Sequence, residues 1–302
     1  MKMKKFILFF VILLIANVGF TQQLPQFTSY QLNPFLYNPA FAGVDGSTQV
    51  NALIRNQWSG IREAPQTDVI NGYGLLRNEK MALGATAFKD VAGADSRRGI
   101  TLSYAYHLRV KNDISLSLGL SAGFLQYRLD HTIINPYDDG DPIFNSSVLS
   151  SVVPTAAFGA YLYADDFYAS IALPQLLTST FTVKDEYSDN SLITDGLTNH
   201  FLIGGGYIKE INSSFTLEPS LMLMMAPPAP IAVELMVKAT YNEMLWSALS
   251  YRLNDAISVY IGVDIDDRFY VAYAHDFVTS ELSTVTSGTN EFKLGFRFNK
   301  GK

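Results

Sequence analysis

The residue types that most often bind metals or transfer protons are sparse in this chain of 302 residues. The four histidines lie far apart, at His107, His131, His200 and His275, without the short spacing that zinc ligands usually show. The chain has no cysteine, and no local motif combines a serine nucleophile with a base and an orienting group. We therefore expect no catalytic residue, no metal and no cofactor, and we do not expect an enzyme.

Two short motifs look like binding loops but lack the required context. The acidic segment at residues 135–142 lacks the spaced oxygen ligands and the final glutamate of a calcium loop. The three glycines at residues 204–206 fall within a strand pattern, whereas a phosphate-binding loop lies between a strand and a helix. We interpret the first motif as a solvated turn and the second as a place of close packing or bending in a sheet.

Charged residues are more informative, because they fall on the polar face of segments that alternate in polarity. Both signs occur there, and the residues are Arg55, Arg109, Glu218, Glu234, Lys238, Arg252, Asp264, Glu291, Lys293 and Arg297. If this face lines the interior of a barrel, the side chains can form ion pairs that partly fill it, or they can line an open pore. The sequence leaves both interpretations open.

Strands must position these charges, because polarity alternates with period two from about residue 48 to the C-terminus. Residues 100–109, 257–265 and 291–298 show the alternation clearly. A soluble β-sandwich is one interpretation. A transmembrane barrel is favoured because the apolar faces of these segments carry no charge, and a Lys or Arg facing lipid costs about 2–4 kcal/mol near the bilayer midplane.

The pattern predicts an all-β fold, an antiparallel outer-membrane β-barrel of about fourteen strands, and single-chain bacterial barrels have an even number. The predicted strands lie near residues 48–57, 67–75, 81–89, 99–110, 113–128, 151–164, 167–174, 199–209, 214–225, 230–241, 245–252, 256–265, 269–276 and 289–299. Short connections alternate with connections that include long polar stretches at residues 129–150, 175–198 and 277–288. Such barrels have short periplasmic turns and longer outer loops, so we expect both termini in the periplasm.

The N-terminus predicts export. Lys2, Lys4 and Lys5 precede an apolar run at residues 6–16 that is too short for a comfortable membrane span, which is typical of a signal peptide. Its removal takes away three lysines and no acid, so the formal net charge changes from −6 to −9. We therefore expect no nucleic-acid partner. The predicted division is a signal peptide at residues 1–21, a periplasmic N-terminal segment or plug at residues 22–47, and the barrel at residues 48–302.

The segment before the first strand carries two Asn-Pro dipeptides, which typically form turns, and Gly43 is a candidate for a positive φ. Together with the Arg-x-Gln-Trp and Ala-Pro-x-Thr elements that follow, this segment closely resembles the PorP/SprF family of the Bacteroidetes type IX secretion system. The C-terminal third also resembles the family, although it has Asn290-Glu291 where His-Glu is usual. The matching positions near the N-terminus are Asn33, Pro34, Tyr37, Asn38, Pro39, Gly43, Arg55, Gln57 and Trp58.

The resemblance implies an outer-membrane role in type IX secretion, in which the matching positions are structural or form a docking segment. The implied partners are outer-membrane lipid, components of the PorK/PorN ring, and a large secreted adhesin with a C-terminal type IX signal. Support for export or cell-surface anchoring of that adhesin would link the chain to gliding motility. A general diffusion porin or small-solute channel is the alternative function, since it would share the barrel and the acidic charge balance.

Overall fold

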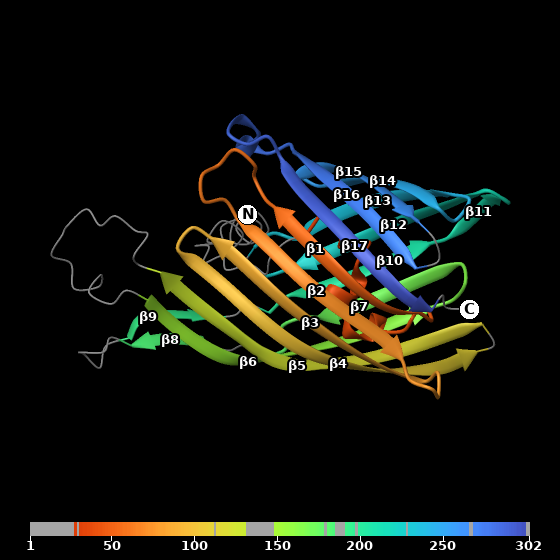
Figure 1. Ribbon diagram of the computed structural model, residues 1–302, viewed down its shortest axis with the longest axis horizontal. Coiled ribbons are helices and arrows are strands. Elements are labelled where there is room, and N and C mark those ends of the chain that lie inside the picture. Colours follow the sequence, from red (N-terminus) through yellow and green to blue (C-terminus); the bar gives the residue numbers. More distant parts are fainter. Residues whose placement is uncertain are drawn as a thin grey trace, which may run out of the picture.

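The structure, a computed structural model, describes residues 27–28, 30–111, 113–130, 148–177, 180–184, 191–196, 199–227, 229–265 and 268–299. The predicted signal peptide at residues 1–21 and the acidic segment at residues 135–142 lie outside these ranges. The described residues form a closed antiparallel barrel around a short N-terminal segment (Figure 1). Within the same ranges, no helix is long and apolar enough to cross a membrane.

Neighbouring barrel strands are hydrogen-bonded in chain order, and the first strand also pairs with the last. Their bounds are β1 (Thr48–Asn56), β2 (Gln66–Leu75), β3 (Met81–Ala92), β4 (Asp95–Lys111), β5 (Ile114–Asp130), β6 (Val148–Tyr163), β7 (Phe167–Leu173), β10 (Phe201–Tyr207), β11 (Lys209–Asn212), β12 (Phe215–Met225), β13 (Ala232–Tyr241), β14 (Leu245–Arg252), β15 (Ala256–Asp264), β16 (Phe269–Val278) and β17 (Thr289–Asn299). Because β10 and β11 both pair with β12, they act as one strand interrupted at Ile208. The barrel therefore has fourteen strands, which confirms the prediction.

Several strands extend into segments that the sequence pattern predicts as loops. Residues 129–130 and 148–150 belong to β5 and β6, and a separate sheet of β8 (Thr180–Lys184) and β9 (Ser191–Gly196) lies within the predicted loop at residues 175–198. The prediction of loop was wrong for these residues. Polar side chains such as Arg128 and Asp130 occupy the end of β5. Where water reaches both faces of a strand, both faces can carry polar residues, so the sequence shows no alternation of polarity there.

The two ends of the barrel differ in their connections. Thr48 of β1 pairs with Asn299 of β17, so the barrel begins and ends at the same rim. At this rim, the short-turn end, each connection between strands has two to five residues. Asn242 and Glu243 form one of these turns with φ values of 49° and 55°, as a type I′ hairpin requires. At the opposite rim, the long-loop end, lie residues 57–65, the connection from β7 to β10, and η5 (Glu281–Thr284).

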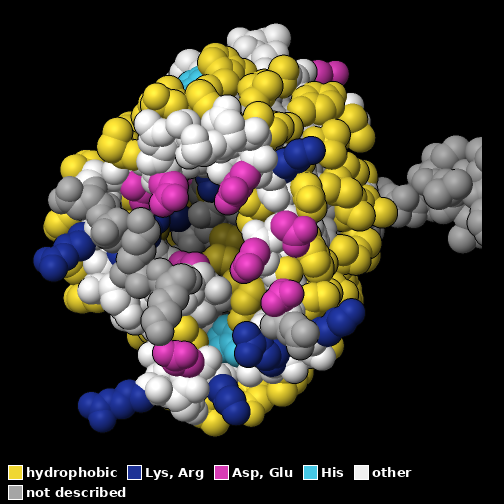
Figure 2. Space-filling model, turned by 90° about the vertical axis from the view of Figure 1, so that its right-hand side faces the viewer, with side chains coloured by type: hydrophobic (Ala, Val, Ile, Leu, Met, Phe, Trp, Pro, Cys, Tyr) yellow, Lys and Arg dark blue, Asp and Glu magenta, His cyan; other side chains and the backbone are white. Residues whose placement is uncertain are grey.

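Inward and outward residues alternate along each strand, as the pattern predicts. In β1, Leu53 and Arg55 face the interior and are 1% and 2% exposed, whereas Ile54 between them is 47% exposed. Exposed apolar side chains of this kind cover the outer wall, and Figure 2, viewed from the short-turn end, shows charged side chains gathered around the mouth instead. An apolar outer band with charges at the rim is what a lipid bilayer requires.

The N-terminal segment lies inside the barrel, and we call its described residues, 27–28 and 30–47, the luminal segment. It contains two short helices, η1 (Pro34–Leu36) and η2 (Pro39–Phe41), each with proline at its first position. Its buried apolar residues are Phe27, Tyr30, Phe35, Tyr37, Ala40 and Ala42. The described part of the predicted segment at residues 22–47 is thus held within the barrel, and its periplasmic location stays a prediction.

Candidate functional site

One side of the lumen binds the start of the luminal segment through buried charges. The Arg55 guanidinium on β1 lies 3.5 Å from carboxylate oxygens of both Asp276 on β16 and Glu291 on β17. The Thr28 backbone N–H donates to Glu291 Oε2 at 2.9 Å, and the Thr28 hydroxyl donates to Asp276 Oδ2 at 2.8 Å and accepts from Arg55. The three charged side chains are 2–3% exposed, so their contacts with one another must compensate for the water that each charge has lost.

A second buried ion pair lies beside the first. Arg252 on β14 contacts Glu234 on β13 at 3.1 Å, and these two residues are direct cross-strand partners. Tyr260 donates from its hydroxyl to the Thr28 carbonyl at 2.7 Å, and Lys293 donates to the Leu32 carbonyl at 2.9 Å. We call this region, defined by Arg55, Glu234, Arg252, Asp276 and Glu291, the charged side of the lumen.

Most of the charged residues predicted on the polar face form ion pairs, as the first of the two interpretations expects. Lys238 lies 3.4 Å from Glu218, and Arg297 lies 2.5 Å from Asp264. Two of the predicted residues differ. Lys293 donates to a backbone carbonyl, that of Leu32, and Arg109 is exposed near the short-turn end of β4. Arg109 has the inward parity that the pattern predicts, and it is exposed because it lies close to the rim.

On the opposite side of the lumen, the luminal segment packs closely against the wall. A side chain at Gly119 of β5 would collide with the backbone of Pro39 and Ala40, and a side chain at Gly159 of β6 would collide with Asn38. His107 of β4 is buried, and its Nε2 lies 2.9 Å from the Ala42 carbonyl oxygen. Because Gly119 and Gly159 have no side chain, η2 lies directly on the sheet.

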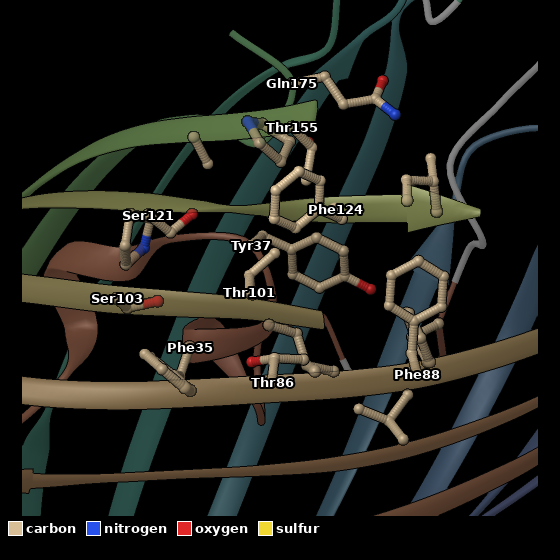
Figure 3. Close-up of a pocket in the computed structure, with 17 residues that line it drawn as sticks. Phe35, Tyr37, Thr86, Phe88, Thr101, Ser103, Ser121, Phe124, Thr155 and Gln175 are labelled. Carbon is tan, nitrogen blue, oxygen red and sulfur yellow. The ribbon is translucent and has the colours of Figure 1, made fainter. Parts of the chain in front are cut away.

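A cavity of about 110 Å³ lies between the luminal segment and the wall (Figure 3). No lining residue is charged. From the wall come Val69, Thr86, Phe88, Thr101, Ser103, Ser121, Phe124, Leu125, Thr155 and Ala157, which we call the neutral side of the lumen. From the luminal segment come Phe27, Phe35, Leu36, Tyr37 and Pro39, and from the loop after β7 come Pro174 and Gln175.

Two tyrosines of the luminal segment lie between the charged and neutral sides. The rings of Tyr30 and Tyr37 are stacked with centroids 4.1 Å apart, and both side chains are buried. Burial raises the pKa of Tyr30 to about 12 and raises the pKa of Tyr37 well above its ordinary value. Both phenols are therefore neutral at physiological pH.

Residues 19–296 match the model of the family described as type IX secretion system membrane protein PorP/SprF. The chain belongs to this family. Membership makes it a membrane component of type IX secretion, and the barrel fold supports a location in the outer membrane. No curated protein matches the chain.

Solved outer-membrane proteins are similar to this chain at low sequence identity. The toluene transporter TbuX of Ralstonia pickettii superposes with a TM-score of 0.53 at 10% identity, over 88% of this chain and 92% of that one. At this identity the likeness to TbuX shows the fold alone. Omp33 of Acinetobacter baumannii gives a TM-score of 0.47 at 10% identity, over 83% and 99% of the two chains. A FadL homologue of Pseudomonas aeruginosa gives 0.46 at 13% identity, over 91% and 94%.

The PorP/SprF motif positions of the luminal segment connect it to the wall. Asn38 caps η2 by accepting from the Ala40 N–H at 3.0 Å, and its amide donates to carbonyl oxygens of Ala160 and Ile171 on β6 and β7. Asn33 is buried ahead of η1. Gly43 has a φ of 77°, which confirms the predicted positive value, and a side chain there would collide with Leu75. Pro34 and Pro39 begin η1 and η2.

The remaining motif positions lie apart from this group. Arg55 belongs to the charged side, whereas Gln57 and Trp58 follow β1 at the long-loop end. The Trp58 backbone N–H donates to the Thr289 hydroxyl at 3.2 Å, and Ser59 exchanges backbone hydrogen bonds with the loop before β17. These contacts hold the first and last connections together where β1 meets β17. The structure thus divides the nine positions between the lumen and one rim.

Sequence reasoning missed several residues of the site. Thr28, Asp276 and Tyr260 bind the luminal segment or hold it on the charged side, yet they lack any local motif of a binding residue. Gly119 and Gly159 carried a usable signal, since both occupy inward positions of strands where a glycine indicates close approach of another backbone. Within the described ranges, no group of three His, Asp or Glu side chains is arranged to hold a metal.

Proposed function

We propose that this chain is an outer-membrane accessory of type IX secretion that supports the export or surface anchoring of one large adhesin, in connection with gliding motility. Family membership supports the secretion role. In the proposed orientation, the short-turn end and both termini face the periplasm, where PorK/PorN ring components are accessible. The long-loop end faces outward and receives the adhesin with its C-terminal signal.

The observation that carries the proposal is the occupied lumen. Buried ion pairs on the charged side bind Thr28, and glycines on the other side hold η2 against the wall. A general porin needs an aqueous path, and large porins leave one open along the axis. A barrel filled by its own N-terminal segment fits an accessory that works through its rims better than it fits a diffusion channel.

Gene deletion tests the role. The deletion strain should lose one large adhesin from its surface while other type IX cargo is still secreted, and a copy of the intact gene should restore the adhesin. Quantitative proteomics of surface and culture medium measures both. Loss of all type IX cargo would instead assign the chain to the core machinery.

The alternative, a diffusion porin or small-solute channel, is tested in planar bilayers. The purified chain should give little steady current, because the luminal segment occupies the interior. A stable open conductance in the intact chain would favour the channel function. This measurement uses the same protein preparation as the binding experiments below.

A further inference from the structure

We propose that the cavity on the neutral side is a binding site for a free, uncharged molecule with one aromatic ring and one hydroxyl group, of the size of phenol. The site is independent of the proposed secretion role, since it uses none of the paired charges. It lies between the aromatic residues of the luminal segment and the hydroxyl residues of β3 to β6 (Figure 3).

The size of the cavity selects a single ring. An engineered protein cavity of about 150 Å³ lined by Leu, Ile and Phe stays dry and binds benzene. The cavity here measures about 110 Å³ and is lined by Phe27, Phe35 and Phe88 among others. These rings offer edge and face contacts of the kind that aromatic pairs prefer.

The absence of charge in the lining selects a neutral ligand. Arg55, Asp276 and Glu291 on the charged side are paired with one another, and none of them lines the cavity. A carboxylate or ammonium group entering the cavity would lose its water and meet no opposite charge.

Polar groups in the cavity select a hydroxyl on the ligand. Thr86 and Thr101 are direct cross-strand neighbours, and so are Ser103 and Ser121, so their hydroxyls form a band across β3, β4 and β5. Each hydroxyl can donate and accept. The Tyr37 hydroxyl is buried near Tyr30, and its geometry falls short of a well-formed hydrogen bond to any residue that the structure describes. A buried donor without an acceptor is costly, so a ligand hydroxyl at this position would supply the missing partner.

Fluorine NMR on the purified chain in detergent tests the site with named probes. We expect 4-fluorophenol to bind at least about tenfold more tightly than 4-fluorobenzoate at neutral pH, because the two differ mainly in charge. N-acetyl-4-fluorophenylalaninamide, whose ring carries a side group with two amides, should bind weakly. Binding of either control as tight as that of 4-fluorophenol would overturn the proposal.

Cavity variants separate specific binding from partition into the detergent. Ser121→Phe fills the cavity and should weaken 4-fluorophenol binding by about tenfold or more. Ser247→Phe makes the same change at an exposed position of β14 and should leave binding unchanged. Equal binding by both variants would refute the site. Retention of the compact gel mobility of unheated barrels shows that each variant is folded.

A gentler variant keeps the test decisive if Ser121→Phe does not fold. Tyr37→Phe retains the ring but removes the unpartnered hydroxyl. It should weaken 4-fluorophenol binding by roughly three- to tenfold and leave fluorobenzene binding unchanged. Unchanged binding of both probes would show that the Tyr37 hydroxyl does not contact the ligand and would overturn the hydroxyl requirement.

Discussion

On the charged side of the lumen, Arg55, Asp276 and Glu291 bind Thr28 through directed contacts, whereas on the opposite side η2 rests on Gly119 and Gly159. The first kind of contact depends on every partner being present, because a buried charge without its partner is strongly unfavourable. The second kind depends only on the absence of side chains. The luminal segment is therefore held by ion pairs and hydrogen bonds on one side and by close packing on the other.

The comparison teaches that the polar face of a barrel strand is not a single environment. Thr101 on the neutral side and Arg55 on the charged side both face inward, yet one lines a cavity and the other lies in an ion cluster. Charged pairs can specify position, although they add stability only where their geometry offsets the loss of water. The neutral side of the lumen instead leaves a cavity beside the luminal segment.

The largest effect is expected for Arg55→Met. It removes the guanidinium that Asp276 and Glu291 share while both carboxylates stay buried, which should lower the free energy of unfolding by about 3–5 kcal/mol. Chemical unfolding of the purified barrel in detergent measures the change. Arg62→Met is the matched control, because Arg62 is 93% exposed and its ion pair with Glu63 should contribute little. Similar losses in both variants would contradict the anchoring role.

Gly119→Leu should act by collision. The added side chain needs the space of Pro39 and Ala40, and overpacking of this kind costs about 1–3 kcal/mol. Displacement of η2 should also raise the conductance of the barrel in planar bilayers. Ala122→Leu adds a similar side chain to the exposed outer face of the same strand and should change neither property. A silent Gly119→Leu would show that η2 does not rest on β5.

Asn38→Ala should have an intermediate effect. It removes the cap of η2 and the bonds to Ala160 and Ile171, at a cost of about 1–2 kcal/mol. Because these contacts connect the luminal segment to the wall, amide hydrogen exchange should accelerate at residues 40–42 and stay unchanged in β15. Asn56→Ala, at an exposed end of β1, serves as the control. Uniform acceleration across the barrel would indicate global destabilisation instead.

The smallest effect is expected for Thr101→Val on the neutral side. The Thr101 side chain lines a cavity, so the isosteric change should alter the free energy of unfolding by less than about 0.5 kcal/mol. The same change at Thr28 removes the bonds to Arg55 and Asp276 and should cost about 1–3 kcal/mol. Unfolding curves of the two variants, recorded side by side, measure the contrast. Equal losses would erase the distinction between the two sides.

Much of the fold could be predicted because lipid imposes a local rule. Ile54 and Leu102 face outward, Arg55 and His107 face inward, and the period-two pattern places all four correctly. The rule ends where the bilayer ends. That is why β5 and β6 continue into predicted loops and why Arg109 is exposed near the rim.

The candidate site could be predicted only in part. The motif resemblance draws attention to Asn38, Gly43 and Arg55, and the structure gives each of them contacts that hold or shape the luminal segment. The motif resemblance gives no sign that Arg55 binds Thr28 or that the luminal segment lies inside the barrel. Nor do the serines and threonines of the neutral side differ in the sequence from any other polar residues of a strand.

The sequence by itself determined the period of the strands, the side of each residue and the family, because these depend on near neighbours and short motifs. Only the tertiary structure decided which charges pair. Thr28 and Glu291, whose contact anchors the luminal segment, are 263 residues apart. They meet because the ring of strands closes β17 against β1, and closure is a property of the whole chain that no local pattern contains.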